Sequence, residues 1–347
     1  MTRKSSRMRR LLSSFLAAMM LVAMLPVSAL AVGAENTGSF VTGPYLMTPK
    51  TNGMVVVWEL DKPMKSIITY GTSDADQKTL EVPVEEGEKF KGESMHMYRA
   101  RLSDLKPAST YTYKVETENG QTMEGHFRTL SEKPDEVRFI VVSDSHRFET
   151  ATQVSDVIAK FDPDFILHTG DMVEGTGSQK DQFPYWFQNV GSFLHNVPVI
   201  YNSGNHDYGV YFDEYVTKVQ KEQYESNETG RNVAFDCGPV HFDMLDSNPW
   251  SLFELNSTAG GGEADAATKA VVNESLDWLK ADLATDNAKK ADFRVVTMHH
   301  PFEDDLTRKY VPSIVENGNV NIMFSGHTHL YSRYASADPK RGADTLY

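Results

Sequence analysis

Five nearly continuous apolar runs in the second half of the chain constrain its fold more than any other feature. The runs occupy residues 137–142, 165–167, 197–201, 293–298 and 320–324. Apolar runs without polar alternation are typical of strands that are buried on both faces of a sheet. Helical patterns lie between the runs, at residues 151–161, 181–195, 267–283 and 305–316. Strands that alternate with helices predict a layered α/β domain, which we place at residues 136–347.

Polar residues that can bind metal ions follow each of the five runs. The segments after the runs contain DSH, GDMVE, GNHD, HHP and GHTH. Because ligands of open α/β sheets bind outside the carboxyl ends of the strands, we expect the five segments to converge. Carboxylate, amide and imidazole groups without thiolates suit manganese, iron or zinc and argue against a structural zinc site. The predicted ligands are Asp144, His146, Asp171, Asn205, His299, His327 and His329.

The spacing of these residues favours two metal ions. Asp144 and His146 stand two residues apart after a strand, so both can turn toward one ion. Asp171 follows a glycine turn, and a carboxylate there can bridge two ions roughly 3.5–4 Å apart. We expect glycine before a ligand where the backbone passes close to the site and leaves no room for a side chain. The glycines concerned are Gly170, Gly204 and Gly326.

Short β-branched or aromatic runs separated by turn residues fill residues 40–130. They lie at residues 54–58, 66–70, 97–102, 110–115 and 126–129. Short strands at this spacing predict an all-β sandwich. The segment 102–113 (LSDLKPASTYTY) resembles the end of a fibronectin type III module, where a leucine, a proline turn and a tyrosine corner recur. We therefore expect a fibronectin type III-like domain, joined to the α/β domain by a short linker at residues 131–135.

Residues 1–31 have the pattern of a signal peptide. A basic head precedes an apolar run at residues 11–25, and small residues precede position 31. The run is short for a membrane span, which needs roughly 20 apolar residues, so we expect no stable membrane anchor. Residues 32–39 are small and polar and suit a linker. The pattern predicts a secreted protein with an extracellular, cell-surface or periplasmic location.

The charge and the cysteine content exclude some classes of function. The chain has a net charge of −14, although residues 1–31 carry five positive charges and no negative ones. Such a surface repels nucleic-acid backbones, so no nucleic-acid binding is expected. A phosphate ester is still compatible with a cleft that holds two dications, because local charge decides there. Cys237 is the only cysteine, and we interpret it as a buried structural thiol.

The ordered motifs D-x-H, G-D, G-N-H-D, H and G-H-x-H of residues 137–347 resemble the calcineurin-like metallophosphoesterase superfamily. With the preceding sandwich and the segment 327–333 (HTHLYSR), the chain is most similar to purple acid phosphatases and their bacterial relatives. The resemblance implies a layered β-sandwich flanked by helices. It also implies a phosphatase that hydrolyses small phosphomonoesters by attack of a hydroxide bridging two divalent metal ions. One ion would take Asp144, His146 and His329, and the other Asn205, His299 and His327, with Asp171 as the bridge.

The chain departs from purple acid phosphatases at two positions. Those proteins have Asp-x-Gly first and a tyrosine three residues after the second aspartate, where this chain has His146 and Glu174. A tyrosinate–iron(III) bond therefore has no candidate ligand. By the resemblance His206 faces the substrate, and we expect it to protonate the leaving group, typically worth roughly 10²–10⁴-fold. We expect the Glu174 carboxylate to orient this ring, with Asp207 as a rival partner and a solvated loop acid as the alternative for Glu174.

Other interpretations stay open at this stage. The same ligands serve a phosphodiesterase or a nucleotidase, and a secreted binding protein with a relic site would also carry them, although relics usually lose ligands. His300 has either a substrate-side role or none. We interpret His96, His126, His168, His195 and His241 as structural. The last residues resemble the start of a strand, and relatives usually continue with further strands, so we expect a fragment.

Overall fold

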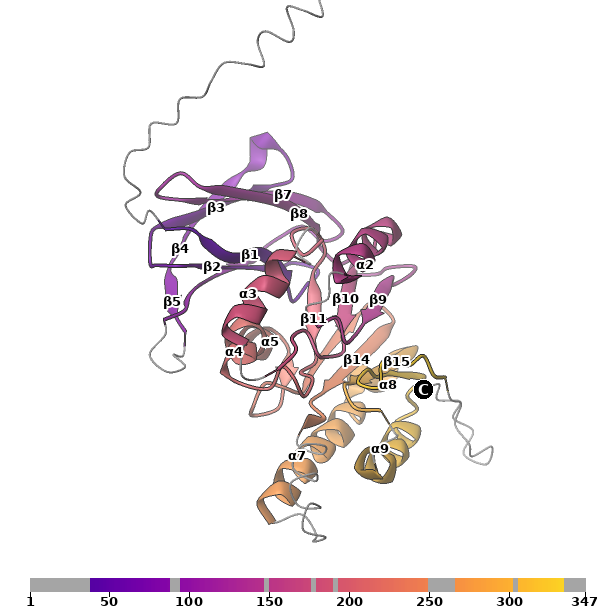
Figure 1. Cartoon of the computed structure of the whole chain (residues 1–347). Helices are drawn as coiled ribbons and strands as arrows, with labels where there is room; N and C mark the ends of the chain where they lie inside the picture. The colour runs from indigo at the N-terminus through magenta and orange to yellow at the C-terminus, as the bar shows by residue number, and fades with distance from the viewer. Residues whose placement is uncertain are drawn as a thin grey trace, which may run out of the picture. The chain divides into compact units, whose positions relative to one another are not determined.

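The computed structural model describes residues 38–87, 94–146, 150–175, 179–189, 193–248, 266–301 and 305–333 (Figure 1). The predicted signal peptide, most of the predicted linker at 32–39 and the last residues of the chain lie outside these ranges. None of the helices in the described part combines the length and the apolar character that crossing a bilayer requires.

The first part of the described chain is a sandwich of two antiparallel layers. One layer contains β1 (Phe40–Met47), β2 (Met54–Leu60), β5 (Val84–Glu86) and β6 (His96–Leu102). The other contains β3 (Ser66–Gly71), β4 (Lys78–Val82), β7 (Thr110–Thr117) and β8 (Thr122–Arg128), with the short η1 (Asp74–Asp76) between β3 and β4. Trp58 and Tyr98 of one layer share an apolar core with Ile68 and Phe127 of the other. The predicted sandwich is confirmed.

The tyrosine corner expected from the sequence is present in this sandwich. The Tyr111 hydroxyl accepts a hydrogen bond from the Lys106 main-chain N–H at 2.9 Å. This contact ties the start of β7 to the turn before it, as the corner does in related sandwiches.

Two packed sheets form the centre of the second part. β9 (Phe139–Val142), β10 (Phe165–His168) and β11 (Val199–Tyr201) are parallel neighbours. The other sheet has the order β12 (Glu225–Ser226), β13 (Val233–Cys237), β14 (Val240–Leu245), β15 (Phe293–Met298) and β16 (Ile322–Phe324). Phe165 of β10 packs edge-on against Phe235 and Phe242 of the second sheet. A shared apolar core therefore holds the two sheets together.

Helices cover both outer faces of these sheets, as predicted. α7 (Ala266–Leu283) and α9 (Asp305–Asn317) pack on the second sheet through a core that includes Leu276, Leu279 and Val311. α3 (Gln179–Asn189), α4 (Val210–Phe212) and η3 (Asp213–Thr217) pack on the first sheet through a core with Trp186 and Tyr215. The remaining elements are α2 (Thr150–Ile158), η2 (Ala159–Phe161), α5 (Lys218–Gln223) and α8 (Asp286–Lys290).

One sheet runs through both parts of the chain. β1 pairs in parallel with β11 through Met47 and Val199, which gives the strand order β5-β6-β2-β1-β11-β10-β9 (Figure 1). The division into two domains with a linker at 131–135 does not anticipate this pairing. The sandwich therefore directly supports the strands from which the segments with Asp171 and Asn205 emerge.

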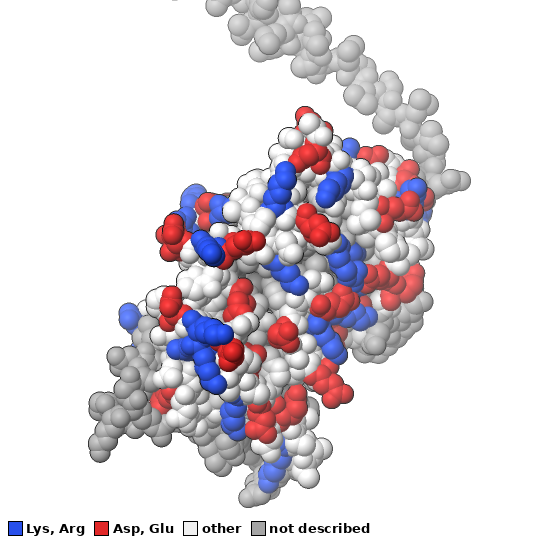
Figure 2. Space-filling view, turned by 180° about the vertical axis from the view of Figure 1, so that it is seen from behind, with Lys and Arg blue, Asp and Glu red and all other residues white. Residues whose placement is uncertain are grey.

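A buried ion pair adds to this connection. Arg99 of β6 and Glu214 of η3 have side chains only 1% exposed, and Arg99 Nη2 lies 3.2 Å from Glu214 Oε2. Arg99 also donates to the Glu214 main-chain carbonyl at 2.6 Å. In contrast to this buried pair, the exposed acidic and basic side chains are interspersed over the face shown in Figure 2.

We expect Arg99→Met to lower the free energy of unfolding by about 3 kcal/mol, because it removes a buried partner of the Glu214 carboxylate and leaves it with the partly exposed Lys218. Urea unfolding followed by circular dichroism measures this change. The matched control is Lys65→Met, which removes the exposed pair of Lys65 with Glu81 at 2.8 Å and should change stability little. Equal losses in the two variants would contradict this role of Arg99.

Candidate metal centre

The predicted ligands follow five strands whose ends meet at one place. Asp144 and His146 come after β9, Asp171 after β10 and Asn205 after β11. His299 directly follows β15, and His327 and His329 come after β16. The main chain links these ends, because Asp144 N–H donates to the Gly170 carbonyl at 3.0 Å and Gly326 N–H donates to the His299 carbonyl at 2.9 Å.

The first group of donors contains Asp144, His146 and His329. Their donor atoms all lie within 4.8 Å of one another. His329 Nε2 lies 3.3 Å from both Asp144 Oδ1 and His146 Nε2. Three donors this close, one of them a carboxylate, fit a divalent ion with oxygen and nitrogen ligands.

The second group is built around His299. Its Nε2 lies 3.1 Å from Asn205 Oδ1 and 3.2 Å from Asp171 Oδ2. The His327 ring packs against the His299 ring, with 5.1 Å between ring centroids. Asp171 and Asp144 also form a donor group with His299, so Asp171 joins the two groups.

Hydrogen bonds to main-chain carbonyls orient the histidine rings. His146 Nδ1 is 3.0 Å from the Val173 carbonyl oxygen, and His299 Nδ1 is 2.9 Å from the Thr169 carbonyl oxygen. A carbonyl only accepts, so each Nδ1 carries the proton and donates it. Each Nε2 then has its lone pair available for a metal ion, which is the usual arrangement for ligating histidines.

Left-handed backbone is concentrated at this centre. Non-glycine residues with positive φ are uncommon, and each stores about 1–3 kcal/mol of strain. Such strain persists where the surrounding structure imposes it, and it is frequent at functional sites. The predicted ligands with positive φ are Asp144 (51°), His146 (42°), Asp171 (56°), His327 (74°) and His329 (54°).

The glycines before three of the predicted ligands stand where a side chain would collide with the centre, as predicted. A Cβ atom at Gly204 would lie 2.1 Å from Asp171 Oδ1, and one at Gly326 would lie 2.4 Å from Asp144 Oδ2. A Cβ atom at Gly170, whose φ is 107°, would lie 2.6 Å from His299 Nδ1. The expectation that backbone passes too close to the site for a side chain is confirmed.

Two buried carboxylates of the centre have opposite environments. Burial raises the pKa of Asp171, but the hydrogen bond and charge of His299 outweigh it and lower that pKa to about 2. Asp207 accepts hydrogen bonds from the main-chain N–H groups of Met172, Val173 and Gly204. Burial, with the nearby Asp171 charge, raises the pKa of Asp207 to about 6. Asp171 therefore remains the candidate ligand, whereas Asp207 ties together the segments that follow β10 and β11.

The structure differs from the predicted His206–Glu174 pair in the contacting atom. His206 Nδ1–H donates to the main-chain carbonyl of Glu174, whereas the prediction used the carboxylate. His206 Nε2 lies 3.9 Å from Asp171 Oδ2, and the side chain is 37% exposed. The rival partner Asp207 points away to the main chain, as expected for a sequence neighbour.

Among the other histidines, His300 lies at the centre although its sequence position gave no decisive signal. Its donor atoms group with those of His299 and His327, and its ring lies 4.5 Å from the His327 ring. His300 Nδ1 is 2.8 Å from Ser247 Oγ. His168 has the predicted structural role, since it is buried and contacts Ser145 Oγ at 2.9 Å.

Cys237 also has its predicted character. It is a free cysteine in the described part of the chain, only 4% exposed, and burial raises the pKa of its thiol to about 12. Such a thiol is unreactive.

Two family descriptions match the chain. Residues 137–331 match "Calcineurin-like phosphoesterase", which is more than half of the chain. Residues 44–129 match "Purple acid Phosphatase, N-terminal domain". The matched ranges correspond to the α/β part and the sandwich described above.

Individual relatives agree with these matches. The chain is 25% identical over 259 residues to purple acid phosphatase 21 of Arabidopsis thaliana, covering 69% of this chain and 53% of that protein. It is 24% identical over 255 residues to acid phosphatase type 7 of Danio rerio, covering 68% and 52%. The chain thus spans about half the length of these relatives.

Solved structures share the fold. The purple acid phosphatase PPD1 from yellow lupin seeds aligns with a TM-score of 0.64 at 17% identity, covering 85% of this chain and 60% of that one. PhoD aligns with a TM-score of 0.54 at 13% identity, covering 86% and 73%. With the family match over residues 137–331, these likenesses confirm the predicted fold class and resemblance, and the chain belongs to the calcineurin-like phosphoesterase family.

Proposed function

We propose that this chain is a metal-dependent phosphatase that hydrolyses phosphomonoesters of small molecules at a site for two divalent ions. The observation that carries this proposal is the connection of two donor groups through the Asp171 carboxylate. A carboxylate between two sets of ligands is the arrangement that two-metal phosphoesterases require. The mixture of carboxylate, amide and imidazole donors suits manganese, iron or zinc.

The residues of the chain would hold the centre in place before substrate arrives. When bound, two such ions lower the pKa of a water molecule and neutralise charge on the phosphoryl oxygens. The carbonyls of Val173 and Thr169 orient His146 and His299, and the hydrogen bonds of Asp207 hold the segments around Asp171. Ligands fixed in this way need little rearrangement, which favours catalysis by positioning.

His206 is the proposed proton donor to the leaving group. The carbonyl of Glu174 holds the Nδ1 side of the ring, which leaves Nε2 on the side of Asp171. In its protonated form, Nε2 can donate to a departing alkoxide. This is the role in which a positioned imidazolium contributes most, because an alkoxide is a poor leaving group.

We also propose that the protein is secreted and acts without nucleic acid as a partner. The support for export is the basic head and apolar run of residues 1–31. The net charge of −14 disfavours binding to nucleic-acid backbones outside a metal site.

Removal of metal by a strong chelator should abolish hydrolysis of p-nitrophenyl phosphate, and manganese, iron(II) or zinc should restore it. Asp171→Asn should be the most damaging single change among the ligands, because it weakens the binding of both ions. Bis(p-nitrophenyl) phosphate and nucleotides, assayed in parallel, identify a diesterase or nucleotidase by their faster turnover. Turnover that chelators do not affect would contradict the two-metal mechanism. If no ester were hydrolysed at any metal loading, the chain would instead be a non-catalytic binding protein.

Gly204→Ala should lower the bound metal and reduce kcat/KM at least about 100-fold, because a displacement near 1 Å at the centre has effects of this size. The new Cβ atom would lie 2.1 Å from Asp171 Oδ1 and 2.3 Å from Asp171 N. Gly175→Ala is the matched control, since its new methyl group would meet no atom of the described residues within 4 Å. Metal analysis and ester kinetics on both variants test this, and a Gly204→Ala protein that behaves like the control would reject the close approach.

His206→Ala should slow phenyl and alkyl phosphates far more than p-nitrophenyl phosphate, because only poor leaving groups need a proton. Metal content should stay near that of the wild type. Glu174→Gln keeps the main-chain carbonyl and should have a much smaller effect. A loss in Glu174→Gln as large as in His206→Ala would assign the role to the carboxylate instead. Equal slowing of good and poor leaving groups would leave His206 as a phosphate-binding residue only.

A further inference from the structure

A second group of potential metal ligands lies under α7. His241 and Asp243 stand two residues apart on β14, so they point to the same face of the sheet. Asp282 of α7 reaches this face, and the donor atoms of His241, Asp243 and Asp282 all lie within 4.8 Å of one another. His241 is in register with Arg294, five residues before His299, which separates this group from the proposed catalytic centre by roughly 16 Å along the strand.

The His241 ring is held between carboxylates. Nδ1 lies 2.8 Å from Asp236 Oδ1 on the neighbouring strand β13. Nε2 lies 2.7 Å from Asp282 Oδ2 and 3.5 Å from Asp243 Oδ2. A carboxylate that accepts from Nδ1–H, with Nε2 directed at further carboxylates, is the arrangement in which histidine commonly binds zinc.

Asp243 is the member of this group that ordinary packing does not explain. It is 0% exposed, and neither of its carboxylate oxygens accepts a hydrogen bond from the described residues; its ion-pair partner is His241, whose Nε2 lies 3.5 Å from Oδ2. Burial of a charged group without hydrogen bonds is strongly unfavourable, so each such group in a native protein calls for a specific cause. The ion pair with His241 therefore satisfies the Asp243 carboxylate only in part, and Asp282 lies within 4.8 Å of it in the same group.

Two other buried aspartates show how this chain usually satisfies such a group. Asp207 is 0% exposed and accepts from three main-chain N–H groups. Asp246, which lies three residues beyond Asp243 and is 5% exposed, accepts from the main-chain and side-chain N–H groups of Asn248. Asp243 lacks any comparable donor among the described residues, although it lies in the same fold and at the same depth.

A network filled by protons is the rival explanation. Burial lowers the pKa of His241, but the hydrogen bonds of Asp236 and Asp282 outweigh it and raise that pKa to about 10. Burial also raises the pKa of Asp243 well above its usual value. In this network a protonated Asp243 would donate to the Asp282 carboxylate, and the zinc content of the protein distinguishes the network from a bound cation.

We propose that His241, Asp243 and Asp282 bind a divalent cation of the zinc class, with Asp236 orienting the imidazole ring. A cation between the three side chains would replace the proton on Nε2 and would complete the partners of Asp243. One imidazole with carboxylates suits zinc and similar ions, whereas calcium and magnesium prefer oxygen ligands alone. The ion would fasten α7 to β14, so its role is structural. This proposal does not depend on the proposed function.

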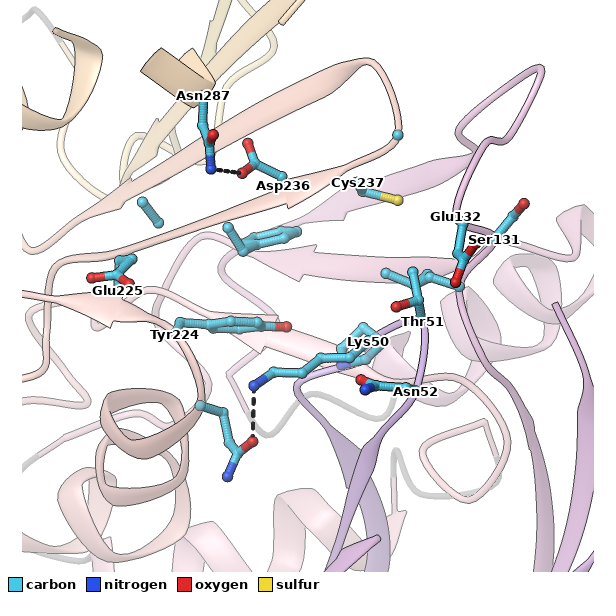
Figure 3. A pocket seen from close by; sticks show the side chains of 16 residues that line it. Lys50, Thr51, Asn52, Ser131, Glu132, Tyr224, Glu225, Asp236, Cys237 and Asn287 are labelled. Carbon is cyan, nitrogen blue, oxygen red and sulfur yellow. Dashed lines mark hydrogen bonds between the residues drawn. The ribbon is translucent and has the colours of Figure 1, made fainter. Parts of the chain in front are cut away.

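The group is accessible from one side. The Asp236 side chain is 43% exposed and the Asp282 side chain 12%. Asp236 and Asn287 line a pocket of about 500 Å³, and Asn287 Nδ2 donates to Asp236 Oδ2 at 3.0 Å (Figure 3). Asp236 therefore contacts both the pocket and the His241 ring.

Zinc per chain, measured by mass spectrometry after loading with zinc chloride and dialysis, tests the proposal. We expect Asp243→Asn to contain one zinc ion fewer per chain than the wild type. The control Asp277→Asn changes an exposed carboxylate of the same helix, paired with Lys280 at 2.9 Å, and should keep the full zinc content. Asp236→Asn, which only disturbs the partner of the ring, should weaken zinc binding at this site about 10–100-fold.

Thermal unfolding gives a second measurement. We expect zinc to raise the melting temperature of chelator-treated wild type more than that of Asp243→Asn, because the variant loses one stabilising ion. Circular dichroism reports whether the variant is folded. Ester turnover, which depends on the residues of the proposed catalytic centre, gives a second check. If Asp243→Asn does not fold, Asp282→Asn at the partly exposed edge of the group replaces it in both measurements.

The proposal is overturned if Asp243→Asn, or the replacement variant, holds as much zinc as the wild type and responds equally to zinc in thermal unfolding. That result would establish the proton-filled network. If only the catalytic ions were lost, ester turnover would disappear, but wild type would still hold one zinc ion more than Asp243→Asn. Failure of the proposed function is therefore distinguishable from failure of this site.

Discussion

The close approach of backbone and side chains at the carboxyl ends of five strands is the constraint on which the centre depends. Gly204 passes so near Asp171 that a single Cβ atom would lie 2.1 Å from the carboxylate. Five predicted ligands have left-handed backbone, at about 1–3 kcal/mol each. The rest of the fold must offset this strain, and two packed sheets with helices on both outer faces provide the apolar cores that do so.

The helices and strands that were predicted well from the sequence have a nearly uninterrupted hydrophobic pattern. The strands β9, β10, β11, β15 and β16 are mostly apolar, and α7 keeps a helical apolar face, so their positions follow from the pattern. β14 was missed because His241 and Asp243 break its apolar run, although it is buried along its whole length. The parallel pairing of β1 with β11 was also missed, since a contact between residues 47 and 199 leaves no trace in local patterns.

The candidate ligands could be proposed from the sequence because each comes shortly after a strand, and the structure brings their donor atoms together. What could not be predicted is which atom makes each contact. The sequence assigned the Glu174 carboxylate to His206, but the main-chain carbonyl of the same residue occupies that position. His300 and His241 show the same limit, because their surroundings come from segments far away in the chain, such as Ser247 and Asp282.

Anomalous diffraction from crystals of the chain loaded with manganese or zinc would locate the metal ions at this centre. We expect two peaks roughly 3.5–4 Å apart, one on either side of the Asp171 carboxylate. One peak should lie between Asp144, His146 and His329, and the other beside Asn205, His299 and His327. A single peak at this centre, or two peaks that do not share Asp171 as a ligand, would contradict the proposed two-metal centre.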